Sequence, residues 1–193
     1  MQGWRGNMED AHIAELDLGD GNSVFAVFDG HGGPEVAKFV KSHFCKSLCH
    51  SAAYKRKEYK KALEDTFIKM DKLLQSEKGK KELRTYMETD EAQAGYQDYL
   101  QSAESQAGCT STVVLITSTE IYCANAGDSR TVMCERGLAV DLSQDHKPEL
   151  PDERSRIIKA GGEVVDGRVN GMLALSRAIG DFDYKILTPP KDA

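Results

Sequence analysis

A run of short alternating segments between residues 110 and 142 constrains the fold of this chain more than any other feature. The segments TVVLIT, IYCANA, RTVMCE and LAVDL are rich in β-branched residues, and the turn sequences STE, GDS and RG separate them. β-Branched side chains favour strands, and connections this short join strands that run in opposite directions. We therefore expect four antiparallel strands here.

Helical patterns precede and follow this run. Pro34 and Glu35 open the first helix, because proline suits the first turn and an acidic side chain suits the positive end of the helix dipole. Its apolar stripe is Val36, Val40, Phe44 and Leu48. A second helix is expected from about 58 to 76, with the stripe Leu63, Phe67, Met70 and Leu74. We expect both stripes to face the core. Residues 152–160 predict a short helix, and Asp166-Gly167 predicts the turn of a further hairpin.

Length and composition indicate an ordinary globular protein. The chain has 193 residues, which suits one domain, and 40% of them are hydrophobic and 29% charged. The net charge of −6 argues against nucleic acid as a partner. The N-terminus has no apolar signal region, and no run is long enough to span a membrane. We expect a soluble monomer located in the cytoplasm or nucleus.

The cysteines are odd in number and form no CxxC pair. They are Cys45, Cys49, Cys109, Cys123 and Cys134. Cys45 and Cys49 lie four positions apart in a helical pattern and therefore share a face. We expect small buried hydrophobic side chains in a reducing compartment, in preference to a zinc site or a disulfide framework.

Residues 76–107 differ in composition from the rest of the chain. They are polar and charged, with scattered tyrosines and no apolar stripe. We interpret them as an insertion or connection, disordered in places.

The segment FAVFDGHGG carries the first candidate site residues. The strand 23–28 is almost continuously apolar and is expected to be buried on both faces, and it ends at Asp29. A carboxylate at a strand end, followed by glycine, suits Mg²⁺ or Mn²⁺, because these ions prefer hard oxygen ligands. Gly30 would let its own carbonyl approach the same ion. Taken alone, Asp29 is better explained as a turn residue or a helix N-cap than as a metal ligand.

The N-terminal segment supplies the other candidates. Glu9 and Asp10 repel each other unless water or a cation screens them, and the guanidinium of Arg5 can bind a phosphate through two hydrogen bonds. His31 titrates near neutrality and can protonate a departing alkoxide. The alternatives are a solvated acidic loop and a structural histidine. Together these residues predict metal-assisted phosphoryl transfer, and the absence of a GxxxxGK[ST] loop disfavours an ATP-using kinase.

Six segments in this order closely resemble the metal-dependent serine/threonine protein phosphatases of type 2C, the PPM family. They are MQGWRGNMEDAH, FAVFDGHGG, CTSTVVLI, ANAGDSR, DHKP and AGGEVVDGRVNGMLALSRAIGDFDYK. The resemblance covers residues 1–75 and 108–185. It implies an α+β fold, a four-layer α-β-β-α sandwich of two antiparallel sheets flanked by helices, incomplete at both ends. Residues 1–193 would then be a partial catalytic domain, with a charged insertion at about 76–107.

The resemblance also implies a metal set. Such enzymes hydrolyse phosphoserine and phosphothreonine in proteins with water activated by two ions, Mg²⁺ or Mn²⁺. Matched by position, Asp29 would bridge the two ions, and the Gly30 carbonyl and Glu9 would bind one of them. Asp10 would orient metal-bound water. Asp128 matches a position that can help to bind a third, weaker ion, although a turn aspartate explains it equally well.

Two residues receive catalytic roles from the resemblance. Arg5 would grip the phosphate of a phosphorylated protein substrate, and His31 would protonate the serine or threonine oxygen as it leaves. The other arginines of the matching segments receive structural or substrate-surface roles and no catalytic one. They are Arg130, Arg168 and Arg177.

The chain departs from the family pattern after GDFDYK. An Asp-Gly pair before a tryptophan and a later Asp-Asn pair do not occur, and the one tryptophan is Trp4. The resemblance therefore implies that the family's C-terminal third, with two metal-binding aspartates, is missing, as is a strand before the first motif. The alternative function is a catalytically impaired fragment or pseudophosphatase that binds phosphoproteins or a partner without turnover.

Overall fold

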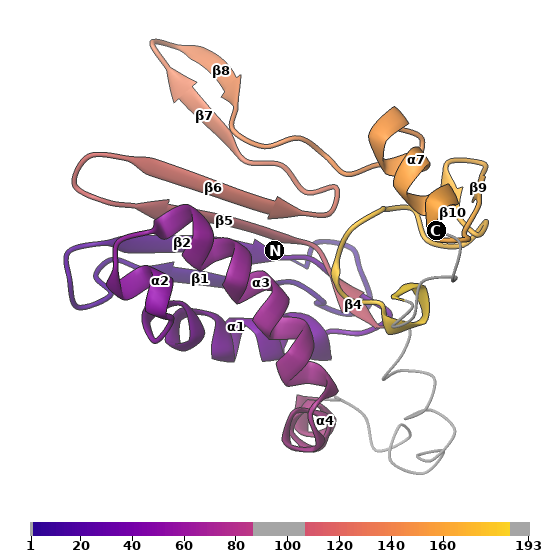
Figure 1. The fold of residues 1–193 in the computed structure, drawn as a ribbon, viewed down its shortest axis with the longest axis horizontal. Helices are drawn as coiled ribbons and strands as arrows, with labels where there is room; N and C mark the ends of the chain where they lie inside the picture. The colour runs from indigo at the N-terminus through magenta and orange to yellow at the C-terminus, as the bar shows by residue number, and fades with distance from the viewer. Residues whose placement is uncertain (1, 87–106, 186–193) are drawn as a thin grey trace.

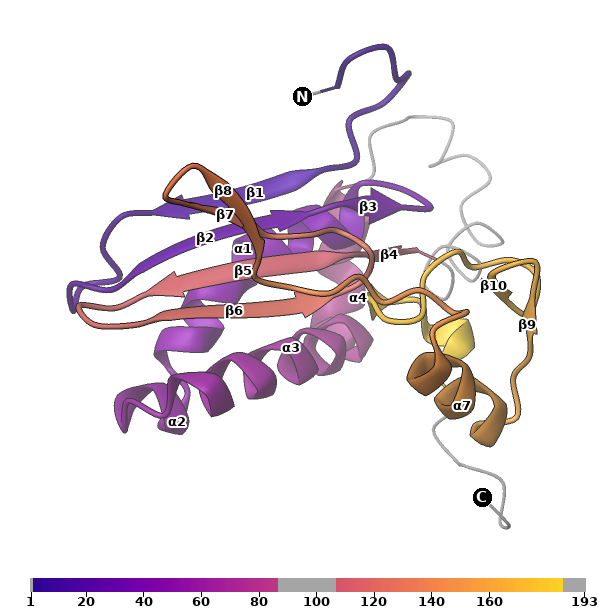
Figure 2. The same cartoon turned by 90° about the horizontal axis from the view of Figure 1, so that it is seen from above.

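A four-stranded antiparallel sheet forms the centre of the computed structural model, which describes residues 2–86 and 107–185. Its strand order is β1-β2-β5-β6, as Figures 1 and 2 show. The strands are β1 (Ala11–Glu15), β2 (Ser23–Phe28), β5 (Ser111–Ile116) and β6 (Ile121–Ala126). Because β5 pairs with β2, the end of β2 meets the beginning of β5, and this junction positions the candidate site.

Helices cover one face of this sheet (Figure 2). They are α1 (Glu35–Cys49), α2 (Ala52–Lys55), α3 (Tyr59–Gln75) and α4 (Glu77–Leu83). The predicted stripe of α1 is confirmed, since all four of its residues are at most 2% exposed. In α3, Leu63, Met70 and Leu74 are buried and Phe67 packs against the core while partly exposed. Helix α2 was not predicted, because a single turn has no periodicity to detect.

Short elements complete the structure around the end of β2. A three-stranded sheet has the order β11-β4-β3. Its strands are β3 (Gly30–His31), β4 (Gly108–Cys109) and β11 (Ile179–Gly180). The predicted helix and hairpin near the C-terminus are confirmed as α7 (Pro151–Lys159) and as the pair β9 (Val164–Val165) and β10 (Arg168–Val169). The 3₁₀ helices are η1 (Arg84–Tyr86) and η2 (Phe182–Tyr184).

The predicted run of four strands is correct in its strands and wrong at one connection. β7 (Val132–Glu135) pairs with β8 (Leu138–Asp141) and leaves β6 without a second neighbour among the described strands. The GDS segment therefore carries the chain out of the central sheet. Hydroxyl contacts hold it over β5: Thr110 bonds Ser129 at 2.6 Å, and Thr112 bonds Thr131 at 2.5 Å.

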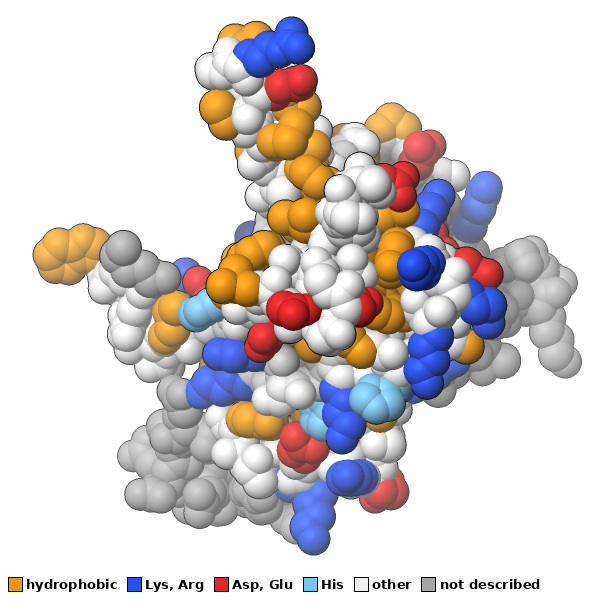
Figure 3. Space-filling model, turned by 90° about the vertical axis from the view of Figure 1, so that its left-hand side faces the viewer, with side chains coloured by type: hydrophobic (Ala, Val, Ile, Leu, Met, Phe, Trp, Pro, Cys, Tyr) orange, Lys and Arg blue, Asp and Glu red, His pale blue; other side chains and the backbone are white. Residues whose placement is uncertain are grey.

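The face of the sheet opposite the helices is only partly covered. We expected β2 to be buried on both faces, and this is wrong: Val24, Ala26 and Phe28 are buried, whereas Val27 is 45% exposed. The β7–β8 hairpin lies on this side (Figure 1), and Val132 and Leu138 on it are exposed. Hydrophobic side chains are visible on the projection at the top of Figure 3. The described residues on this face are too few to cover the second side of β2.

The α+β class is confirmed. In residues 2–86 and 107–185, β7 and β8 form a separate two-stranded sheet on the side of the central sheet opposite the helices (Figure 1). No helix in this described part is long and apolar enough to cross a membrane. Helix α4 and η1 occupy the start of the predicted insertion, and residues 87–106 lie outside the described part.

The cysteines are free in the structure. Cys109 is buried and Cys45, Cys49 and Cys123 are partly buried, as small hydrophobic side chains should be. Cys134 is exposed, so the expectation of burial is wrong there. It lies on β7, whose hairpin projects from the molecule (Figure 1).

Two positions on α3 test the packing of the helix layer. Met70 is fully buried, whereas Ile68, one half-turn away, is 55% exposed. We expect Met70→Ala to lower the free energy of unfolding by about 2–5 kcal/mol, because it removes core contacts and leaves a cavity. Ile68→Ala should change it by about 0.5 kcal/mol or less. Urea unfolding followed by circular dichroism measures both, and equal losses would contradict this packing.

Candidate metal and phosphate site

Backbone hydrogen bonds fix the end of β2 between two neighbouring segments. The Gly30 N–H donates to the Glu9 carbonyl at 3.2 Å, and the Thr110 N–H donates to the Asp29 carbonyl at 2.9 Å. A Cβ atom at Gly30 would lie 2.5 Å from the Glu9 carbonyl oxygen. Only glycine fits this approach, so Gly30 brings the N-terminal segment against the strand that carries Asp29.

The segment before β1 and the end of β2 enclose a hollow of about 240 Å³. Four residues that the sequence predicts for the site line it together: Arg5, Glu9, Asp10 and Asp29. Gln2, Asn7 and Met8 complete its wall. A guanidinium and three carboxylates therefore share one small polar pocket.

The charge of Asp29 is disfavoured in this setting. Partial burial raises the pKa of its carboxyl group, and repulsion from Asp10, a hydrogen bond with Asp10 and the charge of Asp128 raise it further. The charge of His31 opposes these effects. The repulsion between two juxtaposed carboxylates is relieved when a cation binds between them. The environment of Asp29 thus favours a cation, although the side chain itself remains accessible.

Glu9 and Arg5 face each other across the pocket. Arg5 Nη2 lies 3.7 Å from Glu9 Oε2, and the Arg5 side chain is 80% exposed. An exposed ion pair of this kind contributes about 1 kcal/mol or less, so it is easily exchanged for another partner. The guanidinium of Arg5 is therefore free to contact an anion that enters the pocket.

The donor set fits a hard divalent ion held by few protein ligands. Mg²⁺ commonly uses one or two carboxylates and keeps several waters. Asp10 and Asp29 line the pocket and carry such oxygens, whereas Gly30 is not among its lining residues. Within residues 2–86 and 107–185, no three or more His, Cys, Asp or Glu side chains are arranged as a metal-binding group. These residues fit a partial site.

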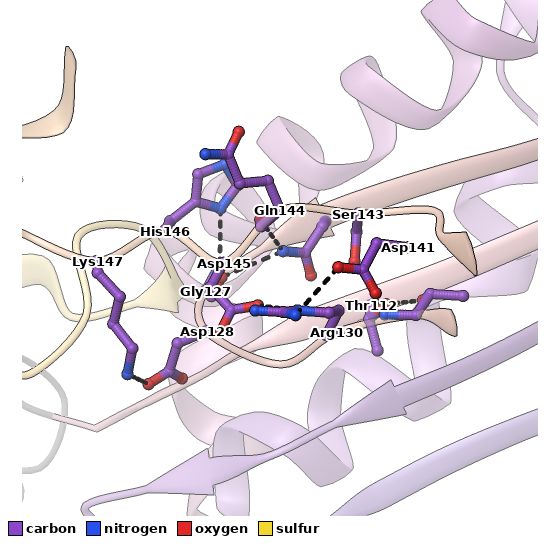
Figure 4. A network of polar contacts seen from close by, with 12 residues as sticks. Thr112, Gly127, Asp128, Arg130, Asp141, Ser143, Gln144, Asp145, His146 and Lys147 are labelled. Atoms are coloured by element: carbon purple, nitrogen blue, oxygen red, sulfur yellow. Dashed lines mark hydrogen bonds and ion pairs between the residues drawn. The ribbon is translucent and has the colours of Figure 1, made fainter. Parts of the chain in front are cut away.

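Asp128 lies near this pocket but does not line it. Its carboxylate forms an ion pair with Lys147, as Figure 4 shows. His146, the neighbour of Lys147, accepts a hydrogen bond from the Gly127 N–H at 3.2 Å and so fixes the turn. The charge of Asp128 still raises the pKa of Asp29 and of His31. Asp128 is close enough to act on the site electrostatically, while Lys147 holds its carboxylate.

His31 contacts a residue that sequence reasoning left without a role. Its Nε2 lies 2.8 Å and 2.9 Å from the two carboxylate oxygens of Asp181. Burial lowers the pKa of His31, but Asp181, Asp29 and Asp128 together raise it above its ordinary value. The sequence signal for Asp181 is weak, because an Asp after a Gly is usual in a turn.

The arginines that received no catalytic role have structural partners. Arg130 pairs with Asp145 at 2.8 Å and with Asp141 at 3.1 Å (Figure 4). Arg177 pairs with the buried carboxylate of Glu153, whose pKa falls to about 2: burial raises it, but hydrogen bonds from Arg177, Ser176 and Arg156 outweigh burial. This pair ties α7 to the segment before β11.

Glu35 is a second residue whose surroundings the sequence does not reveal. It was expected only to favour the positive end of a helix, and α1 does begin there. It is 1% exposed, Oε1 has no hydrogen-bond partner among residues 2–86 and 107–185, and burial raises its pKa. A Cβ atom at Gly33 would lie 2.2 Å from Glu35 Oε2. The second glycine of the GG pair thus makes room for this carboxyl group.

The raised pKa of Asp29 predicts a pH dependence of stability without divalent ions. The unfolded chain ionises Asp29 near the ordinary value of 3.8, below the pKa in the folded state. Ionisation therefore costs folding free energy, and the cost is complete above the folded pKa. We expect Asp29→Asn to be more stable than the native chain at pH 7, and this advantage to disappear below about pH 3.8.

Asp17 gives a control of opposite sign. Hydrogen bonds from the Gly21 and Gly19 N–H groups lower its pKa, so its contribution to stability is present above pH 3.8 and lost as the pH falls through the folded pKa. Asp17→Asn should be less stable than the native chain at pH 7. Thermal unfolding in chelator across pH 3–8 measures both variants, and the same sign for both would contradict this description of Asp29.

Comparison with known proteins shows which family and fold this chain resembles. The family model "Protein phosphatase 2C" matches residues 1–190. "Probable protein phosphatase 2C 2" of Paramecium tetraurelia is 52% identical over 185 residues, which are 96% of this chain and 58% of that protein. "Probable protein phosphatase 2C 21" of Arabidopsis thaliana is 39% identical over 209 residues, which cover 96% of this chain and 59% of that protein. The chain thus spans under two thirds of the length of these relatives.

Solved structures show the same fold. A serine-threonine phosphatase 2C from Toxoplasma gondii superposes with a TM-score of 0.68 at 22% identity, covering 94% of this chain and 66% of that one. A C. elegans sex determining protein superposes with a TM-score of 0.69 at 26% identity, covering 97% of this chain and 44% of that one. With the match over residues 1–190, these findings place the chain in the protein phosphatase 2C family.

Proposed function

We propose that this protein hydrolyses phosphoserine and phosphothreonine in protein substrates with the help of Mg²⁺ or Mn²⁺. One observation carries the proposal: Arg5 lines the same small pocket as Asp10 and Asp29, with Glu9 opposite the guanidinium. A guanidinium can bind a phosphate while neighbouring carboxylates bind a divalent ion, so the two can be held at one site. Family membership supports the same reaction.

The proposed metal ligands are Asp29, Asp10, Glu9 and the Gly30 carbonyl, with Asp128 as a candidate for a third ion. When bound, divalent ions activate water and neutralise charge on the phosphate oxygens. Two ions are expected in the complete site. The observation that supports these ligands is the raised pKa of Asp29 beside Asp10, which a cation would reverse.

Arg5 binds and orients the phosphate in this proposal. Its exposed side chain leaves the ion pair with Glu9 and donates two parallel N–H groups to phosphate oxygens. The bound phosphate would then lie in the pocket that Asp10 and Asp29 also line.

His31 acts as the proton donor. It directly follows Gly30, and its pKa is raised above the ordinary value, which favours the imidazolium form. The proton leaves the ring and joins the serine or threonine oxygen as its bond to phosphorus breaks. The product alcohol therefore departs neutral.

We also propose the cellular setting. The partners are phosphorylated proteins, and the protein acts as a monomer in the cytoplasm or nucleus without binding nucleic acid or membranes. The net charge of −6 supports the exclusion of nucleic acid.

A second candidate is a module that binds phosphoproteins or a partner without turnover. It is supported because the described residues contain no group of three metal-binding side chains. The phosphate contact of Arg5 would survive in such a module, since it depends only on the exposed guanidinium. Turnover separates the two candidates.

The first test compares Mn²⁺ binding with phosphate release. We expect saturating Mn²⁺ to raise the melting temperature of the 193-residue chain, because an ion that binds only the folded state stabilises it by about 2.7 kcal/mol at 100 times its Kd. Asp29→Asn should lose this shift and the Mn²⁺-dependent release of phosphate from a phosphothreonine peptide. Asp152→Asn, an exposed carboxylate on α7, is the matched control and should change neither.

Each outcome of this test assigns a function. A thermal shift with phosphate release supports the phosphatase. A shift and peptide binding without phosphate release support the binding module. Full phosphate release by Asp29→Asn, or by the native chain in chelator, would refute the site.

The second test concerns the proton donor. A serine or threonine alkoxide is a poor leaving group and depends on protonation, whereas p-nitrophenolate leaves with little help. We expect His31→Ala to lower kcat about 10²–10⁴-fold on a phosphopeptide and much less on p-nitrophenyl phosphate. His12→Ala, an exposed histidine on β1, is the control. Equal losses on both substrates would remove the acid role from His31.

A further inference from the structure

The contact between His31 and Asp181 joins β3, near the start of the chain, to the residue that follows β11. Both oxygens of the Asp181 carboxylate lie within 2.9 Å of His31 Nε2, and the two residues are 150 positions apart. Asp181 is 2% exposed, whereas the His31 side chain is 28% exposed. One edge of the imidazole is thus held against a buried carboxylate. No described residue forms a hydrogen bond with the other ring nitrogen, Nδ1.

The small three-stranded sheet sets this contact. His31 lies opposite Gly108 in the β3–β4 pair, and Gly180 lies opposite Gly108 in the β4–β11 pair. A Cβ atom at Gly108 would lie 2.7 Å from the Asp181 carboxylate, and one at Gly180 would lie 2.5 Å from the Ala107 carbonyl oxygen. Both glycines are therefore needed to bring Asp181 beside His31.

The backbone at Asp181 is held in an unfavourable conformation. Its φ angle is +52° and that of Gly180 is +87°, both in the left-handed region. Left-handed residues other than glycine cost free energy and persist only where the surroundings determine them, often at functional sites. The Asp181 N–H donates to the Ala107 carbonyl at 3.0 Å, which holds this conformation.

Helix α3 anchors the same turn. Asp71 Oδ1 accepts a hydrogen bond from the Gly180 N–H at 2.9 Å, and Asp71 Oδ2 lies 2.5 Å from Lys185 Nζ. Lys185 also donates to the Ala178 carbonyl at 2.9 Å. The segment 178–185 is thus fastened to a rigid helix on both sides of Asp181.

We propose that Asp181 is a positioning residue that holds the His31 imidazole through Nε2 and leaves Nδ1 as the nitrogen that delivers the proton. A carboxylate accepts hydrogen bonds, so Nε2 carries a hydrogen and donates it to Asp181. The proton that reaches the serine or threonine oxygen then comes from Nδ1, and Nε2 keeps its own. The kinetic part of this inference rests on the proposed function, whereas the contact itself does not.

Nuclear magnetic resonance of the 193-residue chain tests the contact without any turnover. We expect a slowly exchanging Nε2 proton of His31, shifted downfield, which disappears in His31→Gln and is thereby assigned. In Asp181→Asn it should move upfield but persist, because the amide oxygen still accepts and asparagine tolerates the left-handed backbone. Asp183→Asn, an exposed carboxylate two residues further on, is the matched control and should leave the signal unchanged.

Kinetics test the positioning role. Asp181→Asn should lower kcat on a phosphothreonine peptide by about 10- to 100-fold, the usual effect of removing a partner that orients a reacting group. The KM and the rate on p-nitrophenyl phosphate should change much less, because a good leaving group needs little protonation. A merely structural role would lower both rates together.

A second variant protects the test against unfolding. If Asp181→Asn fails to fold, Asp71→Ala is used instead. This variant keeps the Asp181 carboxylate but removes the hydrogen bond between α3 and the Gly180 N–H, so it should broaden the His31 Nε2 signal. A native chain that releases no phosphate would refute the proposed function, and the spectrum would still decide the positioning role. Absence of the Nε2 signal from the native chain, or Asp181→Asn behaving like Asp183→Asn, would overturn this inference.

Discussion

The pair of hydrogen bonds at the end of β2 determines where the site of this protein forms. The Glu9 carbonyl accepts from the Gly30 N–H and the Asp29 carbonyl accepts from the Thr110 N–H, so three distant segments meet at one point. The Asp29 side chain then projects from a fixed backbone, beside Asp10 and within reach of Arg5. The repulsion among these carboxylates is a consequence of that geometry, and it is the physical reason that the pocket favours cations.

Local patterns in the sequence predict most of the elements and part of the site. The stripes of α1 and α3 follow from helical periodicity, and Asp29, Gly30 and Glu9 follow from their place at a strand end or in an acidic pair. The features of the fold and the site that the sequence does not predict depend on contacts between residues far apart in the chain. The chain leaves the central sheet after β6, where hydroxyl groups of Thr110 and Thr112 bond those of Ser129 and Thr131. The residues of the turn do not predict these hydrogen bonds.

The same reasoning explains the two carboxyl groups whose role or surroundings were missed. Glu35 resembles an ordinary first-turn acid, and only the tertiary structure shows that Gly33 leaves space for it. Asp181 resembles a turn residue until β11 pairs with β4. In both cases a glycine packed against the carboxyl group leaves the space that it occupies. At Gly30 and Gly33 of DGHGG and at Gly180 of GDFDYK, a side chain would clash with neighbouring atoms. Glycine is therefore required there for space as well as for its backbone freedom.

Internal cations already balance part of the acidic charge around the site. Arg5 faces Glu9 within the pocket, and Lys147 holds Asp128 outside it, so both of these acids have a basic partner within the chain. Asp29 and Asp10 have each other instead, and the pKa of Asp29 rises as a result. A divalent ion entering this pocket therefore gains most at Asp29, where no protein cation must first be displaced. At Asp128 it must compete with an ammonium group that is already bound, and this difference orders the two positions by affinity.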